Sequence, residues 1–294
     1  MSHVGIVTDS TSDIPRELID RYQIHVLPVE IVLDGATYRD GIDLSGQSFY
    51  KHFDTYSSIR SKPVSYEDYA LKYKQLTNLY DELIMIHCSA ELSQTYAHAQ
   101  RVHEDFGQTH ACRVSIVDSG QCGLGLGLIV LEAAKAAQDG RSYTEIKQIV
   151  RRCLEATATL FGVPSLKYLR KGRKISGLKS LLGSAIRVKP ILAIEGGSIV
   201  VKSKLFGEHK NMLLEMLQVI EEDVADHRIS LGISHAEAPE QADELKQAML
   251  DRFHCDEAIV SYVGPSIGLN TGPQATGIMY CKRPPDSPTG RSEN

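Results

Sequence analysis

The sequence lacks the features that mark several large classes of protein. Its 294 residues carry 32 Lys and Arg against 37 Asp and Glu, so there is no excess of basic charge for a nucleic-acid surface. The longest apolar stretch, residues 123–131, stops at Glu132, far short of the roughly 20 residues that a membrane helix needs. The chain enters a strand-like run at once, with no signal-peptide pattern. These absences predict a cytoplasmic protein with no nucleic-acid partner and no membrane span.

The sequence also lacks the short motifs of common catalytic and metal sites. Its six cysteines include no Cys-x-x-Cys pair, and scattered cysteines in such a chain are usually small buried side chains. It has neither a Walker A loop nor a Gly-x-Ser-x-Gly elbow. Glycines occur at 123, 125 and 127, but Leu128 stands where a dinucleotide fingerprint requires the last glycine. We therefore expect no metal and no cofactor, and interpret these glycines as points of close helix–sheet packing.

Short apolar runs alternate with longer amphipathic segments in the first half of the chain. The pattern predicts strands at 4–7, 25–33, 83–87 and 113–117 and helices at 14–22, 66–79, 92–103, 126–137 and 144–156. Asp13 is the predicted N-cap of the first of these helices. Such βαβα alternation is typical of a mostly parallel sheet with flanking helices.

The second half of the chain has a different pattern of predicted elements. A β-hairpin is predicted at 187–203 around Gly196-Gly197, and strands and helices then alternate to residue 280. A small helix is predicted at 176–184. The fold class is therefore α/β with two domains, an N-terminal one at 1–160 and a second α/β domain at 161–282. Residues 283–294 are rich in Pro, Ser and charge and are predicted to be a disordered tail.

Small hydroxyl residues follow three of the predicted strands. They occur at 8–13, at Ser89 with Ser93 and Thr95, and at 118–123. Because ligands in open α/β sheets bind where strands end and helices begin, three such segments indicate a shared pocket. Each segment taken singly is better explained as a set of helix caps. Asp9 and Asp118 suit a metal or acid–base pair, but with no companion His or Glu cluster they read as turn residues.

Basic side chains gather at one place in the second half. They are Lys167, Arg170, Lys171, Arg173 and Lys174. Two interpretations stay open, a surface for a phosphate or protein partner and a solvated face.

Six segments, in order, resemble the DegV family of bacterial fatty-acid-binding proteins, over residues 4 to about 280. They are residues 8–15 (TDSTSDIP), 39–43 (RDGID), 92–96 (LSQTY), 168–176 (YLRKGRKIS), 189–192 (KPIL) and 272–273 (GP). The resemblance implies a two-domain protein that holds one long-chain fatty acid, such as palmitate, stearate or oleate, in an internal tunnel between or within the domains. It also implies that the carboxylate is bound by Ser61 and by Ser93, with Thr95 in the same motif.

Four positions depart from the family pattern. Ser61 replaces the family's Thr and keeps the hydroxyl, whereas Asn270 replaces a His and Gln274 a Gly. Phe206 replaces an Arg that is frequent after the hairpin. Asn270 can donate a hydrogen bond to the ligand but cannot carry charge. In relatives that serve a fatty acid kinase, the charged residues belong to acyl-phosphate chemistry and kinase docking, so fatty-acid binding is the firmer expectation here.

The sequence thus predicts a lipid-binding protein, not itself an enzyme, that carries a fatty acid or presents it for lipid metabolism, with a fatty acid kinase subunit as an expected partner. The alternative is an enzyme that acts on a small phosphorylated or carboxylated metabolite at the strand ends. A deep aliphatic cavity favours the lipid, and a short polar cleft around Asp9, Ser93 and Asp118 favours the enzyme.

Overall fold

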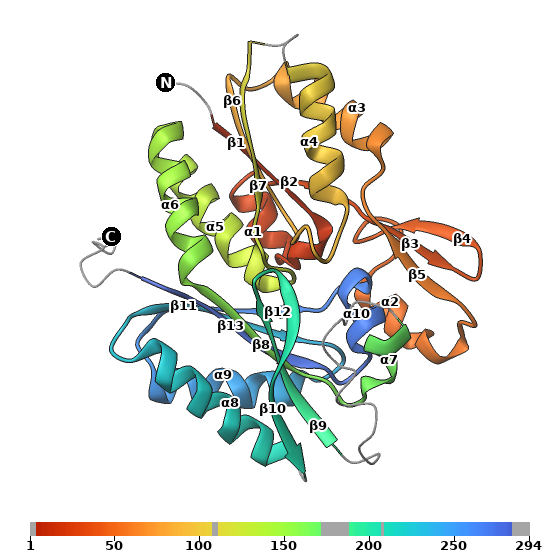
Figure 1. Ribbon diagram of the computed structural model, residues 1–294, viewed down its shortest axis with the longest axis vertical. Helices are drawn as coiled ribbons and strands as arrows, with labels where there is room; N and C mark the ends of the chain where they lie inside the picture. Colours follow the sequence, from red (N-terminus) through yellow and green to blue (C-terminus); the bar gives the residue numbers. More distant parts are fainter. Residues whose placement is uncertain (1–3, 108–110, 172–187, 207–208, 284–294) are drawn as a thin grey trace.

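Three β-sheets flanked by helices make up the protein in a computed structural model (Figure 1). The structure describes residues 4–107, 111–171, 188–206 and 209–283. Within these ranges, no helix combines the length and the apolar character needed to cross a bilayer.

The first sheet is entirely parallel, with strand order β2-β1-β6-β7. Its strands are β1 (Val4–Asp9), β2 (His25–Leu27), β6 (Glu82–His87) and β7 (Arg113–Asp118). Successive side chains of β6 alternate between two apolar clusters, because side chains of a strand point to opposite faces. Leu83 and Met85 pack toward α3 (Tyr66–Thr77) and α4 (Thr95–Phe106), while Ile84 and Ile86 pack toward α5 (Leu124–Gln138). The short α1 (Arg16–Arg21) follows β1.

The second sheet has the strand order β10-β9-β8-β13-β11-β12 and is antiparallel except where β11 pairs with β12. Its strands are β8 (Thr157–Gly162), β9 (Val188–Glu195), β10 (Ser198–Phe206), β11 (Ile229–His235), β12 (Cys255–Tyr262) and β13 (Thr276–Lys282). One face packs against α8 (His209–Val224) and α9 (Pro239–Arg252). The other face meets α5 and α6 (Tyr143–Ala156).

Helix α5 lies between these two sheets and contacts β1 on one side and β8, β11 and β13 on the other. Its side chains are accordingly buried almost all round, as expected of a central helix. Gly127 permits the close approach, because a Cβ there would stand 2.6 Å from the carbonyl oxygen of Ser12. A Cβ at Gly125 would likewise clash with the Thr159 side chain, so the interpretation as packing positions is confirmed for these two glycines. Gly123 differs, because a Cβ there would meet nothing closer than 3.8 Å and its φ of 59° is left-handed.

A small antiparallel sheet, β4-β3-β5, completes the fold. It comprises β3 (Glu30–Leu33), β4 (Ala36–Arg39) and β5 (Ile59–Lys62), and near it lie α2 (Gly46–Lys51), α7 (Leu166–Lys171), α10 (Pro265–Thr271) and the 3₁₀ turns η1 (Ser10–Ser12) and η2 (Phe53–Thr55). Helix α10 contacts β3, β5, α2 and α7. The C-terminal half of the chain therefore packs directly against a sheet from the N-terminal half.

The α/β class, the parallel N-terminal sheet and the hairpin at Gly196-Gly197 are confirmed. Two expectations differ from the structure. The 25–33 segment is not one strand, because Pro28 and Val29 separate β2 from β3, which join different sheets. Asp13 is not the N-cap of α1: that position is Pro15, which makes no side-chain capping bond. The Asp13 carboxylate instead accepts a hydrogen bond from the N–H of Gly264, 251 residues away.

The division at residue 160 stays a prediction. In the structure β8 belongs to the six-stranded sheet and begins at Thr157, directly after α6. The predicted helix at 176–184 and residues 284–294 of the predicted tail lie outside the described residues. Arg283 is described and donates a hydrogen bond to Glu132 on α5.

Candidate functional site

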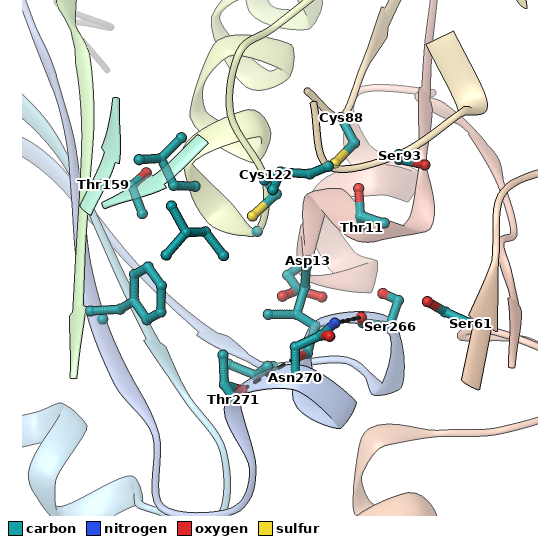
Figure 2. A pocket seen from close by; sticks show the side chains of 18 of the residues that line it. Thr11, Asp13, Ser61, Cys88, Ser93, Cys122, Thr159, Ser266, Asn270 and Thr271 are labelled. Carbon is teal, nitrogen blue, oxygen red and sulfur yellow. Dashed lines mark hydrogen bonds between the residues drawn. The ribbon is translucent and has the colours of Figure 1, made fainter. Parts of the chain in front are cut away.

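A cavity of about 480 Å³ lies where the three sheets meet. Its walls come from η1, β5, the loops after β6 and β7, strands β8, β9, β10 and β13, and α10 (Figure 2). The volume falls within the roughly 300–1,000 Å³ that is usual for small-molecule sites. Of the residues predicted to bind a ligand, Ser61, Ser93 and Asn270 line this cavity.

Hydrophobic side chains form much of the wall. They include Val29, Phe161, Leu169, Ile194, Ile199 and Met279. Four of these come from the six-stranded sheet, whose inner face thus supplies much of the apolar surface. Such a wall stabilises hydrocarbon, because removal of each methylene from water is favourable by about 0.8 kcal/mol.

Ser61, on β5, and Ser93, on the loop before α4, both lie toward the right side of Figure 2, Ser93 above Ser61. The Ser93 hydroxyl oxygen accepts from the N–H of Thr95 at 3.3 Å and lies 3.1 Å from the Thr95 hydroxyl oxygen. Thr95 is fully buried and, among the described residues, is not part of the cavity lining. Thr95 therefore lies behind Ser93 and holds the Ser93 side chain in position.

Thr95 also connects the two serine-bearing segments. Its hydroxyl oxygen accepts a hydrogen bond from the N–H of Val64 at 3.3 Å, and the His98 ring bonds the carbonyl oxygen of the same residue at 2.8 Å. Val64 lies three residues after Ser61, so these bonds fix β5 against the start of α4. The two hydroxyls are therefore brought to one site by α4 itself.

Helix α4 begins beside these hydroxyls without a side-chain cap from its N-cap residue, Gln94. The start of a helix carries N–H groups and a partial positive charge, which suit a carboxylate or phosphate oxygen. Lys62 also lines the cavity, but its ammonium is 3.0 Å from the Glu30 carboxylate and its side chain is 58% exposed. The site therefore offers hydroxyl and amide donors more than it offers net positive charge.

Asp13 enters the cavity from η1, at the centre of Figure 2. Its backbone is left-handed, with φ of 48°, and its Oδ1 accepts from the Gly264 N–H at 3.0 Å. Oδ2 has no hydrogen-bond partner among the described residues. Burial raises the pKa of Asp13 well above its usual range, and the charge of the nearby Asp40 raises it further. Both effects favour the protonated form of the Asp13 carboxyl.

Asp9, four residues earlier, has a different environment. It is fully buried and accepts hydrogen bonds from the N–H and hydroxyl of Thr11, from Nδ1 of His87 at 3.1 Å and from the N–H of Cys88 at 3.1 Å. Burial would raise the pKa of Asp9, but the hydrogen bond and charge of His87 and the other donors lower it below its usual value. This carboxylate joins the ends of β1 and β6.

The polar cleft around Asp9, Ser93 and Asp118 that would favour an enzyme is not assembled in the cavity. Ser93 lines the cavity, whereas Asp9 and Asp118 do not, and the Asp118 carboxylate accepts from the N–H groups of Ala90 and Gly120, as a turn residue does. Among the described residues, no three His, Cys, Asp or Glu side chains are grouped to hold a metal ion.

Comparison with known proteins shows to which family this chain belongs. The family model described as "Uncharacterised protein, DegV family" matches residues 3–283. The chain belongs to the DegV family. A DegV domain-containing protein of Caldanaerobacter subterraneus is 30% identical over 282 residues, covering 95% of this chain and 99% of its own.

Solved DegV structures share the fold. The chain is similar to a DegV family protein from Thermus thermophilus described by its fatty-acid binding, with 28% identity, 96% and 100% of the two chains covered and a TM-score of 0.89. It is also similar to DegV of Bacillus subtilis, described as a fatty acid binding protein, with 26% identity, the same coverage and a TM-score of 0.86.

The two departures from the DegV pattern near the C-terminus lie close to the cavity. Asn270 lines it, and its side-chain amide donates to the carbonyl oxygen of Ser266 at 3.3 Å. Gln274 occupies the position of a family glycine with φ of 66°, a left-handed conformation that glycine adopts more readily. Its side-chain amide donates to the carbonyl oxygen of Glu237, which ties this loop to the end of β11.

The sequence motifs missed much of the site. Asp13 belonged to one of the segments that indicated a pocket, but its own predicted role was that of a helix cap. The apolar wall from β8, β9, β10 and β13 carried no motif that distinguishes it from ordinary core. Of the basic cluster, Arg173 and Lys174 lie outside the described residues. Lys167 is the second residue of α7, and its ammonium stands 5.6 Å from the ring centroid of Tyr168.

Proposed function

We propose that this protein binds one long-chain fatty acid in the cavity and carries it, or presents it to an enzyme of lipid metabolism such as a fatty acid kinase. The carboxylate lies at Ser61 and Ser93 beside the start of α4, and the acyl chain lies against the apolar wall. The protein itself supplies no catalytic group and needs no cofactor. The two DegV relatives described as fatty-acid binding support the choice of ligand.

The observation that carries the proposal is the pairing of two hydroxyls with an aliphatic cavity. Ser61 and Ser93 stand at one side of a space lined by Phe161, Ile194 and Met279. Burial of fifteen methylenes gives on the order of 12 kcal/mol before the costs of ordering and association are subtracted. A buried carboxylate is strongly unfavourable unless it is hydrogen-bonded, and charge-assisted bonds contribute about 1.5–3 kcal/mol each.

The proposal predicts that replacing Ser61 and Ser93 by Ala in one chain weakens uptake at least about tenfold, because the carboxylate loses two donors. Affinity is measured by titrating labelled oleate into delipidated protein. The matched control replaces Ser57 and Ser58, two exposed serines before β5, by Ala. Equal affinity of the Ser61/Ser93 variant and the control would mean that the carboxylate binds elsewhere.

The carrier role has a separate test. The loaded protein is mixed with ATP, with and without a fatty acid kinase subunit, and acyl phosphate is measured. Product is expected only when the kinase is present, because in this proposal the protein binds the acyl chain and the kinase binds the nucleotide. Product formed by this protein alone would favour the enzyme instead.

A further inference from the structure

Several buried polar atoms around the cavity have no hydrogen-bond partner among the described residues. Asp13 Oδ2, Asn270 Oδ1, Ser234 Oγ and Thr276 Oγ1 share this property, and all four residues line the cavity. A buried polar atom without a partner costs about 1–3 kcal/mol, so groups of this kind in a native protein usually serve a purpose. An unsubstituted hydrocarbon cannot satisfy any of them.

Asp13 supplies a donor at this place. Its side chain is about nine-tenths buried, and Oδ1 accepts a hydrogen bond from the Gly264 N–H. Oδ2 is therefore the oxygen that a ligand can contact. The facing acidic groups are Asp40, which follows β4 on the neighbouring small sheet, and Asp9 at the end of β1. Both carboxyls disfavour a negative charge on Asp13 and so favour its protonated form, in which the unpartnered Oδ2 can donate a hydrogen bond.

Asn270 supplies an acceptor. Its amide nitrogen already donates to the Ser266 carbonyl on the same helix, which fixes the orientation of the side chain. The Oδ1 atom is therefore the part of Asn270 that a ligand can use. The bond from Asp13 to Gly264, the residue directly before α10, keeps the Asp13 carboxyl beside the helix that carries Asn270. Figure 2 shows both side chains near the middle of the pocket, with Ser61 and Ser93 to one side and Thr159 to the other.

A hydroxyl group is the simplest ligand group that matches this pair, since it accepts one hydrogen bond and donates another. We propose that the cavity prefers a fatty acid that carries a hydroxyl along its acyl chain, bound between Asp13 and Asn270. The inference rests on the proposed function, and it names the class of fatty acid. Ser234 and Thr276 add hydroxyls on the adjoining strands β11 and β13, so the wall is polar on more than one side.

The test compares three ligands of equal length on the delipidated full chain by calorimetric titration. They are octadecanoic acid, the same acid hydroxylated at a mid-chain carbon, and the same acid hydroxylated at its last carbon. The mid-chain hydroxy acid is expected to bind about tenfold more tightly than the other two, which corresponds to about 1.4 kcal/mol from two hydrogen bonds. Equal or tighter binding of unsubstituted octadecanoic acid would overturn the inference and leave the proposed function intact. If none of the three acids binds, both this inference and the proposed function fail.

Two variants localise the preference. Asn270→Leu removes the acceptor, so the ratio between mid-chain hydroxylated and unsubstituted acid is expected to fall from about ten to about one. Asn78→Leu makes the same chemical change at the exposed end of α3 and should keep the ratio. A tenfold preference that survives in Asn270→Leu would contradict binding at this pair.

Discussion

Asp9 and Asp13 lie four residues apart and are both buried, yet the pKa of Asp9 is lowered and the pKa of Asp13 is raised. Asp9 accepts from four donor groups, and these bonds hold its pKa below the usual value despite burial. Asp13 has one backbone donor and faces Asp40, so burial raises its pKa well above the usual range.

The difference shows that partners, more than burial, decide what a buried carboxyl can do. The oxygens of Asp9 are used to join β1, β6 and η1, and Asp9 does not line the cavity. Asp13 keeps one oxygen without a partner and does line it. The first is a structural residue, and the second is available to a ligand.

The largest effect is expected for Asp9→Ala. Loss of this carboxylate leaves the N–H groups of Thr11 and Cys88 and the His87 ring without their shared acceptor. We expect the free energy of unfolding to fall by about 3–5 kcal/mol, measured by urea denaturation. Asp118→Ala, at another strand end, is the matched control and should cost about 1 kcal/mol. Equal small losses of free energy of unfolding in both variants would contradict the structural role of Asp9.

A smaller effect is expected in the pH dependence of stability. Burial raises the pKa of Asp40 to about 6 in the folded protein, against about 4 when unfolded. The folded state therefore holds this proton more tightly, so its stabilisation is complete below pH 4 and is lost as the pH rises through 6. The free energy of unfolding, measured by urea denaturation, should therefore fall between pH 4 and pH 7. In Asp40→Asn this fall should be smaller by up to about 3 kcal/mol. Identical slopes in the two proteins would contradict the raised pKa.

The smallest effect is expected for Asp13→Asn. An amide oxygen can still accept from the Gly264 N–H, so this hydrogen bond is kept and the free energy of unfolding should change by less than about 1 kcal/mol. Asp13→Ala leaves that N–H unpaired and should cost about 1–3 kcal/mol. A cost for Asp13→Asn as large as that of Asp9→Ala would mean that Asp13 is ionised and structural.

The sequence predicted the local elements of this fold better than its long-range contacts. The alternation of apolar and amphipathic segments located the parallel sheet, and Gly196-Gly197 located the β9–β10 hairpin. Strand β5, which carries Ser61, was not predicted, because its four residues include three polar ones and show no extended pattern. The role of Asp13 was missed for another reason: its partner at Gly264 is 251 residues away.

The candidate site was predicted in part. Family resemblance selected Ser61, Ser93 and Asn270, and all three line one cavity. Thr95 was grouped with them, but its hydroxyl is directed to Ser93 and Val64, a distinction that needs three-dimensional contacts. The apolar wall could not be predicted at all, since a residue such as Ile194 has the same composition and periodicity whether it faces a ligand or the core.

The central claim is that the space between the sheets holds an acyl chain. The most direct measurement is denaturing mass spectrometry of what is released from protein purified from cells, followed by uptake of labelled oleate by the delipidated chain. The account predicts one C14–C18 fatty acid per chain and saturable uptake. Protein that repeatedly releases no fatty acid and also takes up no oleate would contradict it.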